Sequence, residues 1–321
     1  MKKISSLIIC LLFLLSACGA QSSGNLIQVH LPLGYIPDIQ FAPLYVAVRK
    51  GYFREAGIQV TFDYSMETDI TALVGANQIP FGVVSGEQVL LARAQDLPIV
   101  YVAAWYQQYP VSVVAKSDQN IHSPSDLRGK TIGLPGRYGA NYIGLRALLH
   151  AGGLNETDVT LDSINYTQVE ALATGRDQAV SVYTNNEPVQ LKARGYGLTE
   201  LRVADYVQLA SNGLITNEKT IAEKPALVRG MVKAFMRGLA DTIADPAGAY
   251  ETSKSYVENL AQLEAVQQKQ KLATSIELWK ASQLGYSQPK AWESMQTVLL
   301  DMGLLAKPLD ITKAFSNQFL P

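Results

Sequence analysis

Aromatic, amide and carboxylate side chains follow several strand-like runs of this sequence, and together they could bind a flat heterocyclic ligand. The first such segment, GYIPDIQF, places Tyr35, Asp38 and Gln40 on one loop. Aromatic stacking contributes about 0.5–1.5 kcal/mol beyond area burial, and amides or carboxylates hydrogen-bond the edge of a heterocycle. We expect Tyr35 to stack on a ligand and Asp38 or Gln40 to bind its edge. The alternative is a loop fixed by Pro37, in which Tyr35 only covers the core.

Two further segments in the first half carry candidate binding residues. AAWYQQYP brings Trp105, Tyr106 and Tyr109 to the end of an apolar run, and at least one of them is expected to face the ligand. Otherwise the alternation of a strand buries Trp105 in the core and leaves Tyr106 on the surface. VSGEQ places Ser85 and Glu87 at a strand-to-helix turn, where Ser85 either contacts a ligand or only caps the helix.

The segment GRYGANY, in the second half, is a glycine-containing turn that leads into a helix. Free backbone N–H groups at a helix N-terminus favour an anion or a carbonyl oxygen. Arg137 adds charge there, and Tyr138, Asn141 and Tyr142 add two rings and an amide. A plain helix-capping turn is the alternative explanation of these residues.

The segment YTNNEP again ends a strand and begins a helix. Asn185 and Asn186 offer donors and acceptors that match the imide edge of a heterocycle, and Glu187 can accept from a ring N–H. Tyr183 begins the segment, and Tyr166, after an earlier strand, is a further candidate. In the alternative, the asparagines cap the helix and Glu187 interacts with the helix dipole.

The elements between these segments predict two α/β lobes. Apolar runs alternate with helical patterns and the rhythm restarts midway, which favours mainly parallel sheets. We expect lobe 1 at 26–110, lobe 2 at 111–212, and a return to lobe 1 with C-terminal helices at 213–321. Two extended segments, near Tyr109–Val114 and Leu209–Ile215, would form a hinge beside a ligand cleft. Helices are expected at 139–151, 225–244, 247–260, 262–281 and 289–301, and one continuous helix carries an apolar face from Phe41 to Phe53.

The N-terminus predicts export and lipid attachment. A cationic stretch, MKK, precedes the apolar run Leu7–Leu15, which is shorter than the about 20 residues that span a bilayer. The next residues, LSAC, resemble a bacterial lipobox, in which cleavage before Cys18 leaves it to carry acyl chains such as palmitate. We expect a signal peptide at 1–17 and a lipidated tether at 18–25. Because Cys10 leaves with the signal, the folded body would have no thiol. A buried core helix that holds Cys18 is the alternative.

Composition and motifs argue against several other functions. The 321 residues carry 27 basic against 28 acidic side chains without a basic stripe, which argues against nucleic-acid binding. His30, His122 and His150 are scattered, and no HExxH, CxxC or GxSxG motif occurs. The carboxylates of Asp38, Glu67 and Glu187 are not obviously paired for acid–base catalysis. We therefore expect no catalytic residue, no metal site and no cofactor.

Four segments resemble the solute-binding proteins of ABC importers, in the branch of thiamine-pyrimidine-synthesis-like and sulfonate-binding proteins. They are GYIPDIQFAPLYVAVRKGYFREAGIQV, ALVGANQIPFGVVSGEQVLLAR, DLRGKTIGLPGRYGANY, and VYTNNEPVQLKARG with SNGLITNEKTI. The resemblance implies a type II periplasmic-binding-protein fold, with two parallel-type sheets joined by a two-strand hinge and a helical C-terminal extension. Pyrimidine binders of this branch usually carry an Asn and a His in the first loop, where this chain has Asp38 and Phe41. The form GYIPDIQFAPLYVA looks more like that of the riboflavin-binding branch.

The resemblance also implies a function. The protein would be a lipid-anchored monomer on the extracytoplasmic side of the cell membrane, and it would deliver riboflavin to a permease with a cytoplasmic ATPase. A thiamine pyrimidine precursor, such as a formylaminopyrimidine or hydroxymethylpyrimidine, is the first alternative ligand. An alkanesulfonate, held at the GRYGANY turn, is the second. The alternative class is a pyrimidine-synthase-like enzyme, against which the missing cysteines and the lipobox argue.

Overall fold

The computed structural model of the protein describes residues 25–321. The signal peptide predicted at 1–17, the lipidation site Cys18 and all but the last residue of the tether predicted at 18–25 lie outside the described residues. Within 25–321, no helix is both long enough and apolar enough to cross a bilayer.

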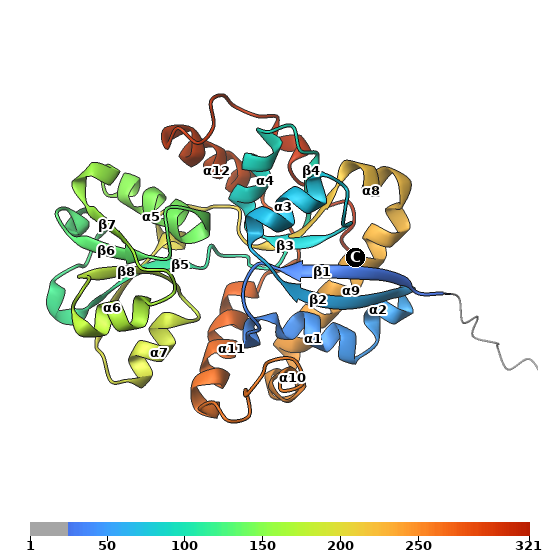
Figure 1. Cartoon of the computed structure of the whole chain (residues 1–321), viewed down its shortest axis with the longest axis horizontal. Coiled ribbons are helices and arrows are strands. Elements are labelled where there is room, and N and C mark those ends of the chain that lie inside the picture. The colour runs from blue at the N-terminus through green and yellow to red at the C-terminus, as the bar shows by residue number, and fades with distance from the viewer. Residues whose placement is uncertain (1–24) are drawn as a thin grey trace, which may run out of the picture.

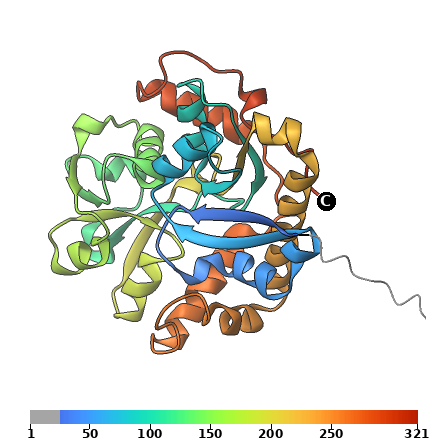
Figure 2. The ribbon, with the colours of Figure 1, turned by 45° about the vertical axis from the view of Figure 1, so that its right-hand side comes forward.

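Two five-stranded sheets, one in each of two lobes, form the framework of the fold (Figures 1 and 2). The lobe 1 sheet has the order β2-β1-β3-β10-β4, with β1 Ile27–Leu33, β2 Ile58–Tyr64, β3 Gly82–Val84, β4 Ile99–Ala104 and β10 Gly213–Asn217. The lobe 2 sheet has the order β7-β6-β8-β5-β9, with β5 Val111–Lys116, β6 Thr131–Leu134, β7 Thr160–Ser163, β8 Ala179–Tyr183 and β9 Leu198–Arg202. The two-lobe α/β fold expected from the sequence is therefore confirmed.

Each sheet contains one strand that runs against its neighbours, so both sheets are mixed rather than purely parallel. In lobe 1, β10 is antiparallel to β3 and β4, with Leu214 opposite Val83. In lobe 2, β5 is antiparallel to β8 and β9, with Val113 opposite Ser181. The reason is topological. The chain enters β5 and β10 directly from the other lobe, so these strands run away from the junction, whereas the other strands of each sheet run toward it.

Helices cover the faces of both sheets. In lobe 1 they are α1 Ala42–Arg49, α2 Tyr52–Glu55, α3 Glu67–Gly75, α4 Gly86–Arg93, α8 Glu218–Glu223, α9 Pro225–Ala244 and α10 Pro246–Ser253. In lobe 2 they are α5 Gly139–Ala151, α6 Gln168–Thr174 and α7 Glu187–Ala193. The core of lobe 1 includes the contact of α9 with α1, where a Cβ on Gly238 would lie 2.2 Å from the carbonyl oxygen of Pro43. The absence of a side chain at this position lets the two helices pack closely.

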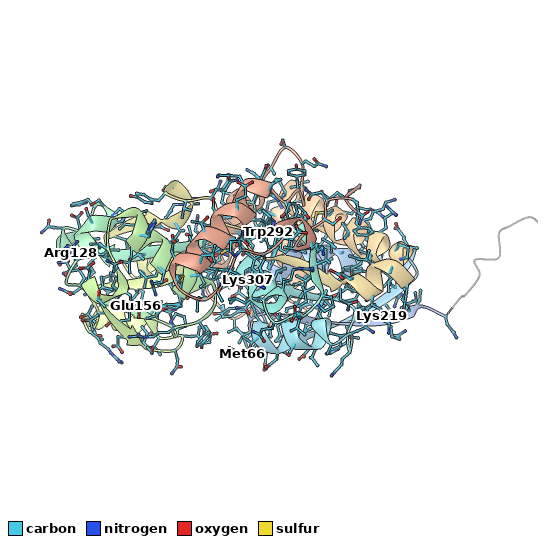
Figure 3. The ribbon with its side chains drawn as sticks, turned by 90° about the horizontal axis from the view of Figure 1, so that it is seen from above. Met66, Arg128, Glu156, Lys219, Trp292 and Lys307 are labelled. Atoms are coloured by element: carbon cyan, nitrogen blue, oxygen red, sulfur yellow. The ribbon has the colours of Figure 1, made fainter. Side chains whose placement is uncertain are left out.

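The last two helices, α11 Ala265–Trp279 and α12 Pro289–Asp301, contact both lobes. Helix α11 packs against the 3-10 turn Ile39–Phe41 of lobe 1 and against α7 of lobe 2. Helix α12 packs against α4 of lobe 1 and α5 of lobe 2, and Figure 3 shows Trp292 of α12 between Glu156 of lobe 2 and Lys219 of lobe 1. The helical C-terminal extension therefore does more than support lobe 1.

Several expected elements differ from the structure. The helix predicted to continue from Phe41 to Phe53 is divided into α1 and α2, because Gly51 adopts a left-handed conformation with φ of 77°. The helix predicted at 247–260 ends at Ser253, and Asn259 has a positive φ that a continuing helix does not adopt. Strand β9 was not predicted, because its sequence LTELR is polar and charged and only Leu201 is buried. It lies at the edge of the sheet, where one side of a strand meets solvent.

Candidate functional site

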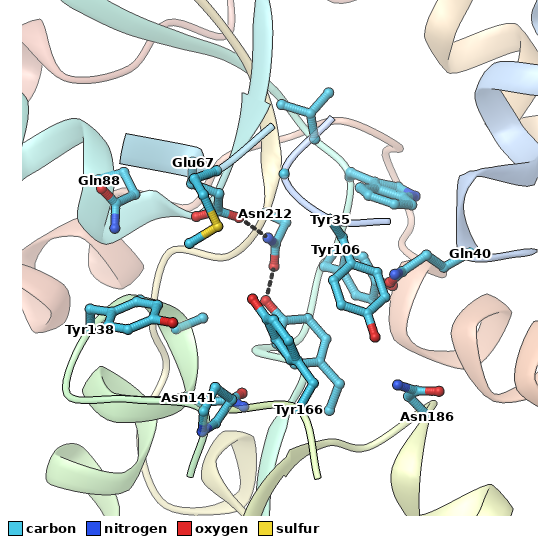
Figure 4. A pocket seen from close by; sticks show the side chains of 18 of the residues that line it. Tyr35, Gln40, Glu67, Gln88, Tyr106, Tyr138, Asn141, Tyr166, Asn186 and Asn212 are labelled. Carbon is cyan, nitrogen blue, oxygen red and sulfur yellow. Dashed lines mark hydrogen bonds between the residues drawn. The ribbon is translucent and has the colours of Figure 1, made fainter. Parts of the chain in front are cut away.

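A cleft lies between the two lobes, at the edge where the parallel strands of both sheets end (Figure 4). The space between its walls that no atom fills is about 970 Å³, and part of this space is open solvent. Loops that follow β1, β4, β6 and β7 and the first turns of α3, α5, α6 and α7 form its walls. Most residues singled out in the sequence line it: Tyr35, Gln40, Trp105, Tyr106, Tyr138, Asn141, Tyr166, Tyr183, Asn186 and Glu187.

Aromatic rings from both lobes border the cleft. Tyr35 of lobe 1 and Tyr166 of lobe 2 lie edge to face, with ring centroids 5.8 Å apart and 73° between the ring planes. Tyr166 is 55% exposed, so this pair lies at the mouth of the cleft. Trp105 and Tyr106 are both buried, with centroids 4.8 Å apart at 61°. Tyr106 therefore does not lie on the surface, and the cleft offers rings from both lobes to a flat ligand.

Asp38 does not line the cleft, because its carboxylate is occupied by groups of the protein. Its Oδ2 accepts a hydrogen bond from Nζ of Lys271 on α11 at 2.5 Å, and its Oδ1 accepts from the backbone N–H of Gln40 at 3.0 Å. The Lys271 and Asp38 side chains are only 7% and 13% exposed. Asp38 thus ties the loop that carries Tyr35 and Gln40 to α11, which the sequence-based role as an edge partner did not anticipate.

Ser85 and Glu87 lie behind the wall of the cleft, where they form a buried cluster with Glu67. The side chain of Ser85 does not cap α4. Its hydroxyl lies within hydrogen-bonding distance of Oε2 of Glu67 and Oε1 of Glu87. A hydroxyl has one proton and donates to only one of two carboxyl oxygens. The other carboxyl must therefore be protonated and donate to Ser85, so Glu67 and Glu87 share a proton.

Burial is the main cause that raises the pKa of both carboxyls in this pair. Burial is the larger cause for both residues, and the charge of Glu87 adds to it at Glu67, whose pKa rises from 4.5 to about 8. Of the two, Glu67 lines the cleft. The interpretation that Glu67 is unpaired was wrong, because its partner comes from α4, which packs against α3.

Tyr109, Tyr142 and Asn185 also lie away from the cleft lining. The buried hydroxyl of Tyr109 donates to the carbonyl oxygen of Ala140 at 3.0 Å, behind the first turn of α5. The hydroxyl of Tyr142 donates to Glu156 at 2.6 Å. Asn185 donates through Nδ2 to the hydroxyl oxygen of Tyr106 at 3.1 Å and to that of Ser275 on α11 at 2.8 Å. Asn185 therefore links lobe 2 to lobe 1 and α11.

Five polar residues line the cleft without having been predicted there. They are Glu67, Thr68, Gln88, Gln168 and Asn212. Gln88 belongs to VSGEQ and Asn212 to SNGLITN, two segments that had been singled out. Gln168 and Glu67 begin the helices α6 and α3. The sequence feature that could have predicted these lining residues is a polar side chain in the first helical turn after a strand.

Asn212 connects the two lobes through hydrogen bonds. Its Nδ2 donates to Oε1 of Glu67 in lobe 1 at 3.2 Å, and its Oδ1 accepts from the hydroxyl of Tyr183 in lobe 2 at 3.3 Å (Figure 4). Asn212 immediately precedes β10 and so lies on the second crossing between the lobes. A relative movement of the lobes changes the geometry of this chain of hydrogen bonds.

The charged side chains that line the described cleft are acidic. They are Glu67 and Glu187, and no Lys, Arg or His is among the lining residues of 25–321. Burial raises the pKa of Glu187 to about 6, while backbone N–H groups, including that of Tyr183, bind its carboxylate and oppose the rise. Within the same residues, no group of three or more His, Cys, Asp or Glu is placed to hold a metal ion.

Comparison with known proteins identifies the family. The family described as NMT1/THI5 like matches residues 38–249. The chain belongs to the NMT1/THI5-like family. Among relatives in this family, the riboflavin-binding protein RibY of Chloroflexus aurantiacus is 41% identical over 302 residues, which cover 92% of this chain and 86% of RibY. The formylaminopyrimidine-binding protein of Halalkalibacterium halodurans is 28% identical, with 98% of each chain covered. A 4-amino-5-hydroxymethyl-2-methylpyrimidine phosphate synthase of Legionella pneumophila is 23% identical, with 92% of each covered.

Solved structures show the same fold. The alkanesulfonate-binding protein SsuA of Xanthomonas axonopodis pv. citri, bound to MOPS, is similar with a TM-score of 0.72 and 16% identity, covering 92% of this chain and 100% of that one. The aliphatic sulphonate-binding protein SsuA of Escherichia coli has a TM-score of 0.74 at 14% identity, covering 92% and 93%. These likenesses establish the periplasmic-binding-protein fold. With the more similar relatives, they identify the NMT1/THI5-like chain as a solute-binding protein.

Proposed function

We propose that the protein is the lipid-anchored substrate-binding component of an ABC importer and that it captures riboflavin in the cleft between its lobes. The observation that carries the proposal is the set of aromatic rings that both lobes bring to the cleft, with Tyr35 and Tyr166 at its mouth. The isoalloxazine of riboflavin is a flat fused ring system, which gains from stacking on both faces. The 41% identity with a protein named for riboflavin binding supports the same ligand.

Each group of cleft residues has a part in this proposal. Tyr35, Trp105, Tyr106 and Tyr166 contact the ring system, because they are the aromatic residues of the mouth and of the buried wall. Gln40 and Asn186 bind its edge. In Figure 4, the side chains of Gln40 and Asn186 lie at the same end of the cleft, on opposite sides of it. Micromolar binding needs about 8 kcal/mol, which several rings and a few hydrogen bonds can provide.

The alternative ligands are less well supported. The relative named for a formylaminopyrimidine is 28% identical, compared with 41% for the relative named for riboflavin. A sulfonate is an anion, and the charged lining residues are Glu67 and Glu187. The first turn of α5 offers free N–H groups, but the charged side chains of the cleft that it faces are acidic and do not attract an anion. The likeness to SsuA proteins supports the fold and not their ligand.

An enzymatic role as a pyrimidine synthase is also less well supported. The relatives with that name are at most 26% identical among those compared, whereas the two more similar relatives are named for binding. His30 lies on β1 with its ring 3.5 Å from Asp63, and none of the histidines lines the cleft. The sequence holds no cysteine after Cys18. The lining of the described cleft therefore offers neither a cysteine nor a histidine for nucleophilic catalysis.

The proposed mechanism is closure of the lobes on the ligand. Residues 26–110 and 213–321 move as lobe 1, and 111–212 move as lobe 2. Tyr166 and Asn186 approach the ring from lobe 2, while Tyr35 and Gln40 hold it from lobe 1. The ligand shifts the population toward the closed form only by its greater affinity for that form. The closed form then docks on the permease.

The ligand and the anchor are tested separately. Riboflavin at 100 times its Kd stabilises the folded protein by about 2.7 kcal/mol and so raises the Tm. A panel of riboflavin, formylaminopyrimidine and taurine compares the candidates. A shift only with taurine or the pyrimidine would overturn the riboflavin proposal. For the anchor, Cys18→Ala should abolish palmitate labelling in bacterial cells and release the protein from the membrane fraction. Continued labelling would contradict the lipid site.

A further inference from the structure

Two buried amide oxygens on lobe 2 lack a partner at the wall of the cleft. Oδ1 of Asn141 and Oε1 of Gln168 have no hydrogen-bond partner among residues 25–321, and the two residues are 8% and 1% exposed. Both residues line the cleft. Buried acceptors are nearly always paired in native proteins, so two neighbouring exceptions at a ligand site indicate that the ligand supplies the donors.

The orientation of these two amides follows from a contact they share. Nδ2 of Asn141 donates to the backbone carbonyl oxygen of Ser181 at 3.3 Å, and Nε2 of Gln168 donates to the same oxygen at 3.5 Å. A flipped amide would place its oxygen against that carbonyl oxygen, where no hydrogen is available. The oxygens of Asn141 and Gln168 are therefore the atoms left for a ligand.

The Glu67 carboxyl of lobe 1 lies at the same end of the cleft as Asn141. Glu67 lines the cleft and connects through Asn212 to Tyr183, which lies two residues after Ser181 on β8. In Figure 4, Glu67 and Asn141 lie at one end of the cleft and Gln40 and Asn186 at the other. Asn141 and Gln168 form what we call the acceptor cluster. A ligand that satisfies it must present several donors close together, as a row of hydroxyl groups does.

The other end of the cleft contains a donor without a partner. Nε1 of Trp105 is buried and has no acceptor among the described residues. Gln40 accepts from the hydroxyl of Tyr106 at 3.0 Å through Oε1, which leaves its Nε2 hydrogens for another acceptor. Carbonyl oxygens at the edge of a ring would suit these donors. The unpaired buried donor of Trp105 thus lies beside Tyr106, whereas the unpaired acceptors of Asn141 and Gln168 lie beside Ser181.

We infer that the acceptor cluster is a polyol subsite, which binds the hydroxyl groups of the ligand while the carbonyl edge of its ring faces Trp105 and Gln40. This inference rests on the proposed function, since in riboflavin the hydroxyls are those of the ribityl chain. It assigns the direction in which the ligand lies. It also assigns Asn141 and Gln168 to ligand specificity.

The test compares riboflavin with lumiflavin, which has the same ring system and a methyl group in place of the ribityl chain. The wild-type protein should bind riboflavin at least about tenfold more tightly than lumiflavin. Gln168→Met and Asn141→Leu remove the acceptors at similar volume. Each should weaken riboflavin binding by about tenfold and lumiflavin binding by less than about threefold. Gln270→Met, the same substitution on the exposed face of α11, should change neither affinity.

Binding of lumiflavin by the variants also shows that their cleft is folded. Equal affinity of the wild type for both flavins would overturn the polyol subsite while leaving the proposed function standing. If Gln168→Met and Asn141→Leu lose equal affinity for both flavins, the polyol subsite is also overturned and the proposed function still stands. If the wild-type protein binds neither flavin, the proposed function itself fails and the inference fails with it.

Discussion

Tyr35 and Tyr166 belong to different lobes and meet edge to face at the mouth of the cleft, with 5.8 Å between their ring centroids. Each ring lies on a loop just after a strand, β1 for Tyr35 and β7 for Tyr166. A ligand held between the lobes therefore contacts two rings whose separation depends on lobe closure.

Replacing either ring should weaken the binding of riboflavin. Tyr35→Leu and Tyr166→Leu keep apolar bulk and remove the aromatic face. Each should raise the Kd for riboflavin by about twofold to tenfold, which corresponds to the 0.5–1.5 kcal/mol of aromatic stacking. Isothermal titration calorimetry measures the change. Tyr206→Leu, at a 44% exposed tyrosine that does not line the cleft, is the control. An unchanged Kd in the Tyr35 and Tyr166 double variant would exclude both rings from the site.

The ion pair between Asp38 and Lys271 should contribute to stability because both side chains are nearly buried. Lys271→Met leaves the Asp38 carboxylate without its partner, so the free energy of unfolding should fall by about 3–5 kcal/mol. The double variant with Asp38→Asn should regain part of this loss. Urea denaturation gives both values. Lys280→Met breaks an exposed pair with Glu277 and should cost less than about 1 kcal/mol. Equal effects at Lys271 and Lys280 would refute the structural role of the buried pair.

The stability of the protein should depend on pH through Glu67. Its folded-state pKa is raised from 4.5 to about 8, so the folded state binds more protons than the unfolded state between these values. Stability associated with Glu67 is therefore present below about pH 4.5 and is lost as pH rises through 8, by on the order of 2–4 kcal/mol. Between pH 5 and 8.5, the free energy of unfolding of Glu67→Gln should therefore decline less than that of the wild type. The exposed Glu258→Gln should retain the wild-type decline. A Glu67→Gln profile parallel to the wild type would show that the carboxyl pair does not hold an extra proton.

FMN should bind more weakly than riboflavin, because its phosphate ends the ribityl chain and would approach the acceptor cluster. The cleft lining contributes carboxyl groups and no cation among the described residues. We expect a Kd for FMN at least about tenfold higher than for riboflavin at low salt and neutral pH. The ratio should be nearly unchanged in Glu67→Gln, because the Glu67 carboxyl, whose pKa is raised to about 8, is then already mostly uncharged. Calorimetric titration of both ligands into both proteins measures the ratio. If FMN binds as tightly as riboflavin, the phosphate does not approach the acceptor cluster, and this orientation of the ligand is contradicted.

Local sequence patterns were sufficient for much of the fold. The bounds of α5, α9 and α12 agree with the expected helices at 139–151, 225–244 and 289–301, because periodic apolar residues and N-terminal prolines or glycines mark them. Strand ends also marked most of the cleft lining, since the loops after parallel strands meet at one edge of a sheet. Strand β9 was not predicted, because an edge strand with one buried side chain has no apolar pattern.

The remaining site could not be derived from local patterns because its contacts are long-range. Asp38 lies next to Gln40 in sequence, but its partner Lys271 is 233 residues away on a helix whose packing no local signal indicates. Glu67 and Glu87 become a pair only when α3 packs on α4 and Ser85 comes between them. The pair holds a proton because tertiary packing buries it, so residue composition and spacing do not predict that proton.

The most direct test of the account is a fluorescence titration of riboflavin with the wild-type protein. Stacking against tyrosine and tryptophan quenches flavin emission, so we predict a saturable quench at one riboflavin per protein with a Kd in the micromolar range or below. The double variant Tyr35→Leu and Tyr166→Leu should require more protein to reach the same quench. Emission that stays unchanged at saturating protein, while formylaminopyrimidine or taurine raises the Tm, would contradict the claim that aromatic rings of both lobes hold a flavin.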